Sequence, residues 1–236
     1  IRRDFSANVS HELKTPLTTI KGFGELLENG IFTKEEDVKK YGGMIYRESE
    51  RLLYLINDII RLSQIEEQEH VLSDKIDLLK TAHDVEEILR HKADNREVTM
   101  TVEGEPVRIY GNQSYITELF LNLMDNAIKY NREGGSLKVT VGAEDGKAVA
   151  VFSDTGIGIS DEHQSRIFER FYRVDKSRSK QTGGTGLGLS IVKHIVAYHS
   201  GEIQLESELE KGTTITVKLP FNEPETQRAE ETAVTE

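Results

Sequence analysis

The pattern of apolar residues at the start of the chain has the spacing of a helix. Between residues 2 and 28 they recur about every three or four positions, and Asn29-Gly30 supplies a helix stop. Thr33, with Glu36 one turn later, has the form of a capping box and predicts a second helix that runs to about Glu66. We therefore expect a helical hairpin over residues 1–66.

The second of these helices carries an apolar heptad repeat. Together the two helices have an apolar stripe wider than one hairpin can bury, so we expect two copies of the chain to pair into a four-helix bundle. The alternative is that the hairpin packs on its own C-terminal domain. Pro16 lies inside the first helix and predicts a bend after it. The repeat consists of Val38, Ile45, Leu52 and Ile59, with Tyr41, Leu55, Ile56 and Leu62 beside it.

The remainder of the chain mixes two periodicities. Residues 67–75 lose the heptad repeat and predict a linker, and residues 76–221 combine short alternating runs with helical patterns. Antiparallel strands with helices on one face, an α+β two-layer sandwich, account for them most simply. The acidic tail 222–236 lacks periodicity and is expected to be disordered. Strands are expected at 98–102, 107–110, 137–141, 149–153, 203–206 and 213–219, and helices at 83–92, 112–130 and 187–199.

Composition removes several classes of function. The net charge of −11 argues against nucleic-acid binding, which normally needs a basic face. The chain has no cysteine, so disulfides and cysteine-based metal or redox sites are excluded. It has no apolar run long enough to span a membrane. Because it opens at Ile1 within a helical pattern, we expect a fragment of a longer protein.

The first candidate for chemistry lies on the first helix. His11 and Thr15 are one turn apart and share a face, while Glu12 is adjacent in the chain. An imidazole beside a carboxylate can act as a nucleophile, with Glu12 taking or orienting a proton, and Thr15 could hold a water. An isolated histidine–glutamate pair is more often part of a solvated helix face, so the decision depends on the rest of the chain.

The second candidate is a polar line on the predicted helix 112–130, opposite an apolar stripe. Amide oxygens are neutral ligands suited to Mg²⁺, and a lysine one turn further could meet phosphates. A solvated helix face is the alternative. The polar line consists of Glu118, Asn122, Asn126 and Lys129, and the stripe of Ile116, Leu119, Leu123, Ala127 and Tyr130.

Two glycine-rich segments complete the candidates. In Asp154-Thr155-Gly156-Ile157-Gly158 the glycines allow close approach to a flat ligand, and the carboxylate can accept from an amine such as that of adenine. An ordinary strand-ending turn is equally compatible with it. The run 183–189 feeds a helix start and forms an anion site. Between the two, residues 168–173 precede the polar stretch 175–182, which would suit a lid over phosphates.

Taken together, these segments resemble the sensor histidine kinases of bacterial two-component systems. The chain carries all five segments in the order of that family, over residues 1–220, and its opening is similar in particular to the phosphate-sensing branch. The matching segments are H-E-L-K-T-P at 11–16, N-L-M-D-N-A-I-K-Y at 122–130, D-T-G-I-G at 154–158, F-E-R-F-Y-R at 168–173 and G-T-G-L-G-L at 184–189.

The resemblance implies a role for each matching residue. His11 would accept the γ-phosphoryl group of ATP, Glu12 would be the general base, and Thr15 would position water for a phosphatase reaction. Asn122 and Asn126 would hold Mg²⁺, and Asp154 would bind the adenine amine. Further contacts to the nucleotide would come from Lys129, Tyr130, Gly156, Gly158, Arg173, Gly184, Gly186, Leu187 and Gly188.

The resemblance also implies an architecture and partners. A dimerisation and histidine phosphotransfer hairpin would precede an ATP-binding domain of the type found in gyrase, Hsp90 and histidine kinases. The partners would be a second copy of the chain and the receiver domain of a response regulator. The chain would be the cytoplasmic portion of a membrane-anchored sensor, attached only through segments that precede it. The alternatives from the residues are an ATPase of the same fold, a nucleotide-binding dimeric scaffold, and a fragment acting mainly as a phosphatase.

Overall fold

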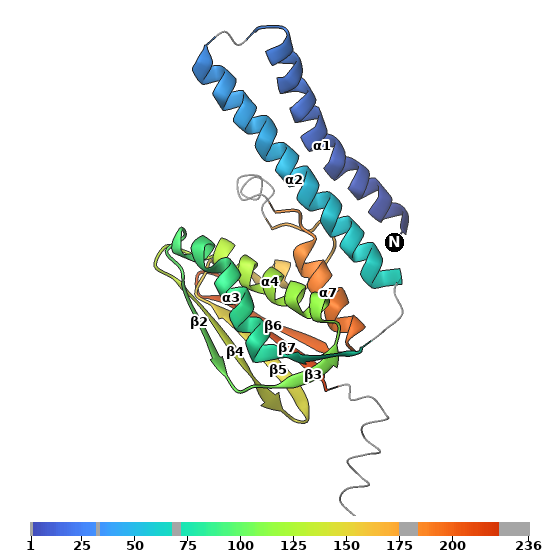
Figure 1. Cartoon of the computed structure of the whole chain (residues 1–236), viewed down its shortest axis with the longest axis vertical. Coiled ribbons are helices and arrows are strands. Elements are labelled where there is room, and N and C mark those ends of the chain that lie inside the picture. The colour runs from blue at the N-terminus through green and yellow to red at the C-terminus, as the bar shows by residue number, and fades with distance from the viewer. Residues whose placement is uncertain (1, 32–33, 68–71, 175–183, 222–236) are drawn as a thin grey trace, which may run out of the picture. The chain divides into compact units, whose positions relative to one another are not determined.

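The computed structural model describes residues 2–31, 34–67, 72–174 and 184–221 (Figure 1). It divides into two compact units, one formed by Ile1–Gln64 with Glu169–Leu187, the other by Ile65–Phe168 with Gly188–Glu236. Four predictions lie wholly or partly outside the described residues: the cap at Thr33, the centre of the linker 67–75, the lid stretch 175–182 and the tail 222–236.

Two long helices form most of the first unit. Helix α1 spans Arg2–Glu28, as predicted, and continues without interruption through Pro16. Helix α2 spans Glu35–Glu67, and the three acidic residues of its first turn match the positive end of the helix dipole. No helix in the described part of the chain has both the length and the apolar character needed to cross a membrane.

Helix α2 buries one apolar face and exposes another. Leu55 and Leu62 are buried, whereas Ile45, Leu52 and Ile59 of the predicted heptad are only partly covered. A neighbouring stripe at similar heptad spacing is exposed to solvent within one chain. This stripe consists of Tyr46, Leu53, Ile56 and Ile60. The hairpin alone therefore leaves a long apolar surface uncovered.

The second unit contains a five-stranded sheet with the order β2-β4-β5-β7-β6 and a separate antiparallel pair, β1 and β3. The prediction that all strands are antiparallel is wrong for one pair, because β2 and β4 run parallel. The crossover between them contains helix α4, as parallel neighbours require. The strands are β1 (Asp74–Asp77), β2 (Thr99–Gly104), β3 (Arg108–Gly111), β4 (Ser136–Glu144), β5 (Lys147–Asp154), β6 (Glu202–Glu208) and β7 (Gly212–Pro220).

Three helices, α3 (Leu78–Asp94), α4 (Gln113–Lys129) and α7 (Gly188–Tyr198), lie over one face of this sheet (Figure 1). The predicted two-layer α+β architecture is confirmed. Helix α3 begins at Leu78 rather than at His83, because the Asp77 side chain accepts a hydrogen bond from the Lys80 amide at 3.0 Å and caps it. Strand β1 and the short helix α5 (Asp161–Gln164) were not predicted.

Helix α4 lies between α3 and α7 in this layer, and two hydrogen bonds fix its start. Asn112 caps its start by accepting from the Tyr115 amide at 3.2 Å, and the buried His199 accepts from the Asn112 amide at 3.1 Å. Of the predicted apolar stripe, Tyr130 is the exception, because it is 39% exposed at the helix end. The other stripe residues, Ile116, Leu119, Leu123 and Ala127, are buried.

Candidate functional site

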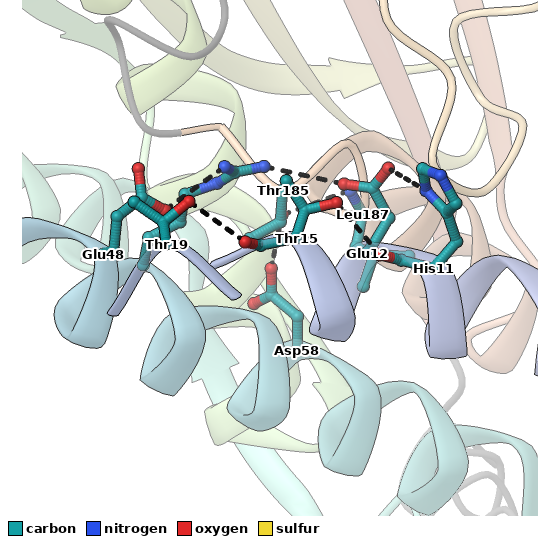
Figure 2. Close-up of polar contacts among 9 residues, drawn as sticks. His11, Glu12, Thr15, Thr19, Glu48, Asp58, Thr185 and Leu187 are labelled. Carbon is teal, nitrogen blue, oxygen red and sulfur yellow. Dashed lines mark hydrogen bonds and ion pairs between the residues drawn. The ribbon is translucent and has the colours of Figure 1, made fainter. Parts of the chain in front are cut away.

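Helix α1 presents His11 to solvent. Its side chain is 81% exposed, and its Nδ1 lies 3.8 Å from Oε1 of Glu12 (Figure 2). When Nδ1 carries the ring proton toward the carboxylate, the lone pair of Nε2 is free to react. The predicted pairing of an accessible imidazole with the neighbouring carboxylate is therefore present in the first unit.

Glu12 also faces a cation from the second helix. The Arg51 side chain, only 11% exposed, places one nitrogen 3.5 Å from Oε2 of Glu12 and another 3.6 Å from Oε2 of Glu48. Arg51 was not among the predicted residues, because only the pairing of the two helices brings it to Glu12. The arginine holds the Glu12 carboxylate beside His11 and partly screens its charge.

Thr15 lies one turn beyond His11 on the same helix, as predicted. Its hydroxyl donates to the His11 carbonyl at 3.2 Å, and the Thr19 hydroxyl donates in the same way to the Thr15 carbonyl at 3.1 Å (Figure 2). Such bonds to the preceding turn are usual for threonine in helices. The Thr15 hydroxyl oxygen keeps lone pairs that can accept a hydrogen bond from water.

The first unit also contains the segment 169–187, in which two of the motifs meet. The Phe171 amide donates to the Gly186 carbonyl at 2.9 Å, and both residues have positive φ, 63° and 76°. A Cβ at Gly186 would lie 3.0 Å from Phe171 Cα and 3.2 Å from Arg173 Cγ. Glycine is therefore required at this crossing, which brings Arg173 next to the run that begins at Gly184.

The threonine of this glycine run, which was not among the predicted residues, contacts helix α2. Thr185 Oγ1 donates to Asp58 Oδ2 at 2.6 Å and accepts from the amide of the buried Leu187 at 3.2 Å (Figure 2). Burial raises the pKa of the Asp58 carboxyl, and the hydrogen bond from Thr185 offsets part of that rise. The contact fixes the backbone just before Gly188.

In the second unit, the two asparagines of helix α4 lie against the first residue of α7. A Cβ at Gly188 would be 2.6 Å from Asn122 Oδ1 and 3.9 Å from Asn126 Nδ2. The Asn122 amide group donates to the Glu118 carbonyl at 3.0 Å, so its oxygen is turned outward from the helix. The predicted asparagine face therefore meets the glycine run at Gly188, with no room for a larger residue.

The end of α4 carries the last two residues predicted there. Lys129 Nζ lies 5.3 Å from the centre of the Tyr130 ring, within the range of a cation–π contact. The partly exposed ring and the ammonium group together offer a flat apolar surface beside a positive charge. This combination suits a base and its phosphates.

Asp154 is the last residue of β5 and begins the D-T-G-I-G loop. Its Oδ1 accepts from the Gly156 amide at 2.8 Å, and burial raises the pKa of its carboxyl, with backbone bonds from Gly156 and Thr213 offsetting part of the rise. A Cβ at Gly156 would lie 2.5 Å from the Tyr130 carbonyl oxygen. Gly158 has φ of 64°, and a Cβ added there would lie 1.9 Å from the Glu208 carbonyl oxygen.

These residues fit an adenine nucleotide with Mg²⁺. A partly buried carboxylate on a loop that only glycine can form offers an acceptor to an exocyclic amine. Two amide side chains supply neutral oxygen, which suits an ion that also binds phosphate oxygens. Among the described residues no group of three or more histidines, cysteines or acidic residues could hold a metal by itself. The protein therefore offers a partial ligand set that a triphosphate would complete.

Two protein-family models match the chain. Residues 1–68 match "His Kinase A (phospho-acceptor) domain", and residues 111–223 match "Histidine kinase-, DNA gyrase B-, and HSP90-like ATPase". The first contains His11, Glu12 and Thr15. The second contains both asparagines of α4 and the two glycine-rich segments.

Longer proteins and a solved structure are also similar. The chain is 38% identical to the sensor-like histidine kinase SenX3 of Mycolicibacterium smegmatis, over 97% of the chain and 60% of SenX3. It is 34% identical to the sensor protein SrrB of Staphylococcus aureus, over 93% of the chain and only 38% of SrrB. Histidine kinase ThkA, solved in complex with the response regulator protein TrrA, matches 93% of the chain and 61% of its own, with TM-score 0.74 and 26% identity.

Proposed function

Because this chain belongs to the histidine kinase family, we propose that it phosphorylates its own His11 with ATP and passes the phosphoryl group to an aspartate of a response regulator. The observation that carries the proposal is the exposed His11 ring with the Glu12 carboxylate 3.8 Å from its Nδ1. Incubation with γ-labelled ATP tests it, because one labelled residue is expected.

The chemistry at His11 follows from its tautomer. With the proton on Nδ1, Nε2 attacks the γ-phosphorus, the bond to the leaving oxygen of ADP breaks, and Glu12 accepts the Nδ1 proton. Phosphoryl transfer has a loose transition state, so the protein acts mainly by positioning groups and by neutralising charge. Arg51 contributes by holding Glu12, the acceptor of the proton.

The nucleotide would be held by the residues predicted from the sequence. Asp154 would accept from the adenine amine, Tyr130 would flank the base, and Lys129 and Arg173 would meet phosphates. Asn122 and Asn126 would hold Mg²⁺, which supplies positive charge that neutralises the phosphate oxygens when bound. The backbone around the nucleotide would be shaped by Gly156, Gly158, Gly184, Gly186, Leu187 and Gly188.

The proposal assigns a task to each part of the chain. Residues 1–66 would form the dimerisation and phosphotransfer hairpin, residues 76–221 the ATP-binding domain, and residues 67–75 the linker. Phosphorylation of His11 requires the nucleotide to come in line with Nε2. The linker would allow the ATP-binding domain to move until the γ-phosphate of its nucleotide lies in line with Nε2.

We further propose that the chain forms a homodimer through the exposed stripe of α2. Ile56, 39% exposed in one chain, should be covered by a partner copy. Ile56→Glu should weaken dimerisation by at least about a hundredfold, because each dimer would bury two unpaired charges. Sedimentation equilibrium should give twice the chain mass of 26.7 kDa for the parent and that mass for the variant at micromolar concentration.

Arg47→Glu is the matched control for this experiment. It adds the same side chain to an exposed position of α2, two and a half turns earlier and hence on the opposite face, given about 3.6 residues per turn. Arg47→Glu should remain dimeric. A dimer of unchanged affinity in Ile56→Glu would mean that another surface pairs the chains.

We also propose that the chain acts as a phosphatase on the phosphorylated response regulator, with Thr15 positioning the attacking water. Thr15→Ala should lower the rate of dephosphorylation of a phosphorylated response regulator by about ten- to a hundredfold, since it removes the oxygen that would position water. Its autophosphorylation should change less than about twofold. Thr15→Ser keeps the hydroxyl and should retain most of the phosphatase rate. An equal loss in both activities for Thr15→Ala would contradict a role specific to the phosphatase reaction.

A further inference from the structure

The guanidinium group of Arg132 binds three backbone carbonyls of two loops. Its Nε donates to the Thr155 carbonyl at 2.7 Å, and one terminal nitrogen donates to the carbonyls of Gly156 and Glu210 at 3.1 and 2.5 Å. Arg132 follows the end of α4, and the first two carbonyls belong to the D-T-G-I-G loop. Glu210 lies in the turn between β6 and β7.

Three carbonyl oxygens that converge on one place repel one another unless a donor lies between them. The planar fork of arginine offers five N–H groups and a permanent charge, so one side chain can satisfy all three. Three other backbone groups of the loop are also hydrogen-bonded, to neighbours outside it. The Thr155 amide donates a hydrogen bond to the Ser136 carbonyl, and the Ile157 amide donates to the Tyr130 carbonyl. The Ile157 carbonyl accepts from the Glu210 amide.

One peptide group connects Arg132 to Asp154 directly. The carbonyl of Thr155 and the amide of Gly156 belong to the same planar unit. The carbonyl accepts from Arg132 Nε at 2.7 Å, and the amide donates to Asp154 Oδ1 at 2.8 Å. A rotation of this peptide would therefore break both bonds together. By holding this peptide, the guanidinium group fixes the position of the Gly156 amide that binds Oδ1. The orientation of the carboxylate, and so the direction of its other oxygen, depends in part on that amide.

We propose that Arg132 is a positioning residue that sets the preference of the site for a 6-aminopurine. It touches no nucleotide and acts through the Thr155–Gly156 peptide on the Asp154 carboxylate. The proposal rests on the proposed function, in which this carboxylate accepts from the adenine amine. When the peptide is free to rotate, the carboxylate loses the Gly156 amide as a donor and keeps the backbone bond from Thr213, so its oxygen is held less firmly toward that amine. The side chains proposed to meet the phosphates, Lys129 and Arg173, are not bonded to this peptide in the contacts described above.

The test compares the affinities of the chain for ATP and ITP. ATP carries an amine at position 6 of the purine, and ITP carries an oxygen there. Calorimetry on the full chain should show ATP bound about tenfold more weakly by Arg132→Ala, and ITP less than about threefold more weakly. The preference for ATP should therefore fall. Arg132→Lys, with a single donor group, should recover part of this preference. Arg96→Ala removes another exposed arginine of the same unit and should leave both affinities unchanged.

Each contrary outcome overturns a different part of the argument. Equal weakening of ATP and ITP binding in Arg132→Ala would mean that the arginine only supports the fold. Unchanged affinities would mean that the loop keeps its form without it. A melting curve for each variant shows whether it is folded, and Arg132→Lys keeps the test valid if the alanine variant is not. If Asp154→Asn retains the full preference for ATP, the assignment of the adenine amine to Asp154 fails, and the Arg132 proposal fails with it.

Discussion

Replacing His11 by glutamine should reduce incorporation of label from γ-labelled ATP by at least about a thousandfold, to background. Glutamine is similar in length and polarity, but its amide nitrogen is not a nucleophile. Because the His11 side chain is 81% exposed, the free energy of unfolding should change by no more than about 0.5 kcal/mol. ATP affinity should also be unchanged, because no residue that we assign to the nucleotide is altered.

His83→Gln is the matched control. His83 is also exposed and also has a carboxylate nearby, with Nδ1 3.1 Å from Oε2 of Glu86. If any exposed histidine beside an acidic residue could accept the phosphoryl group, the two substitutions would have similar effects. We expect full labelling in His83→Gln. Label retained in His11→Gln would assign the acceptor role to another residue.

The second large effect is expected at Asp154. Its carboxylate accepts backbone hydrogen bonds from Gly156, at 2.8 Å from Oδ1, and from Thr213, so in Asp154→Asn the amide oxygen should keep the Gly156 bond and the NH₂ group should replace the other oxygen. This NH₂ group would face the amine of adenine, and two donors would meet. ATP affinity should fall by about a hundredfold, because two donors would face each other in a partly buried site. Binding of ITP, which offers an acceptor at that position, should fall much less.

The same substitution should stabilise the nucleotide-free protein. Burial raises the pKa of the Asp154 carboxyl above its ordinary value of 3.8, so the ionised form is disfavoured in the folded state. The stability that this group contributes is fully present below pH 3.8 and is lost as the pH rises through the folded-state pKa. Asp154→Asn avoids that loss. Its melting temperature should exceed that of the parent at pH 8, and the difference should shrink toward pH 4. A lower melting temperature at pH 8 would contradict this account.

The helices were largely predictable because their signals are local. The limits of α1 agree with the apolar spacing and the Asn29-Gly30 stop, and those of α4 agree with the N-cap residue Asn112. Strand β1 was missed because its four residues, D-K-I-D, have a single apolar side chain. The parallel pairing of β2 with β4 depends on which strands meet after a crossover, and no local pattern records that choice.

In the candidate site, too, residues in local motifs were predicted and residues with distant partners were not. Some of the predicted residues lie close together within one unit, for example Gly188 and Asn122. Arg51 and Arg132 were missed because their partners are distant in sequence, Glu12 for the first and backbone carbonyls of two loops for the second. Every residue has a backbone carbonyl, so the sequence does not indicate which carbonyls a side chain will bind. A side chain that binds the backbone of a loop, as Arg132 does, can therefore be identified only from the fold.

The most direct test of the central claim is to locate the phosphoryl group. The chain is incubated with γ-labelled ATP and Mg²⁺, tested for loss of label in acid and its retention in alkali, and digested for peptide mapping. The account predicts one acid-labile, alkali-stable label on the peptide that contains His11. Acid-stable label, label on another peptide, or release of free phosphate without any labelled protein would contradict it.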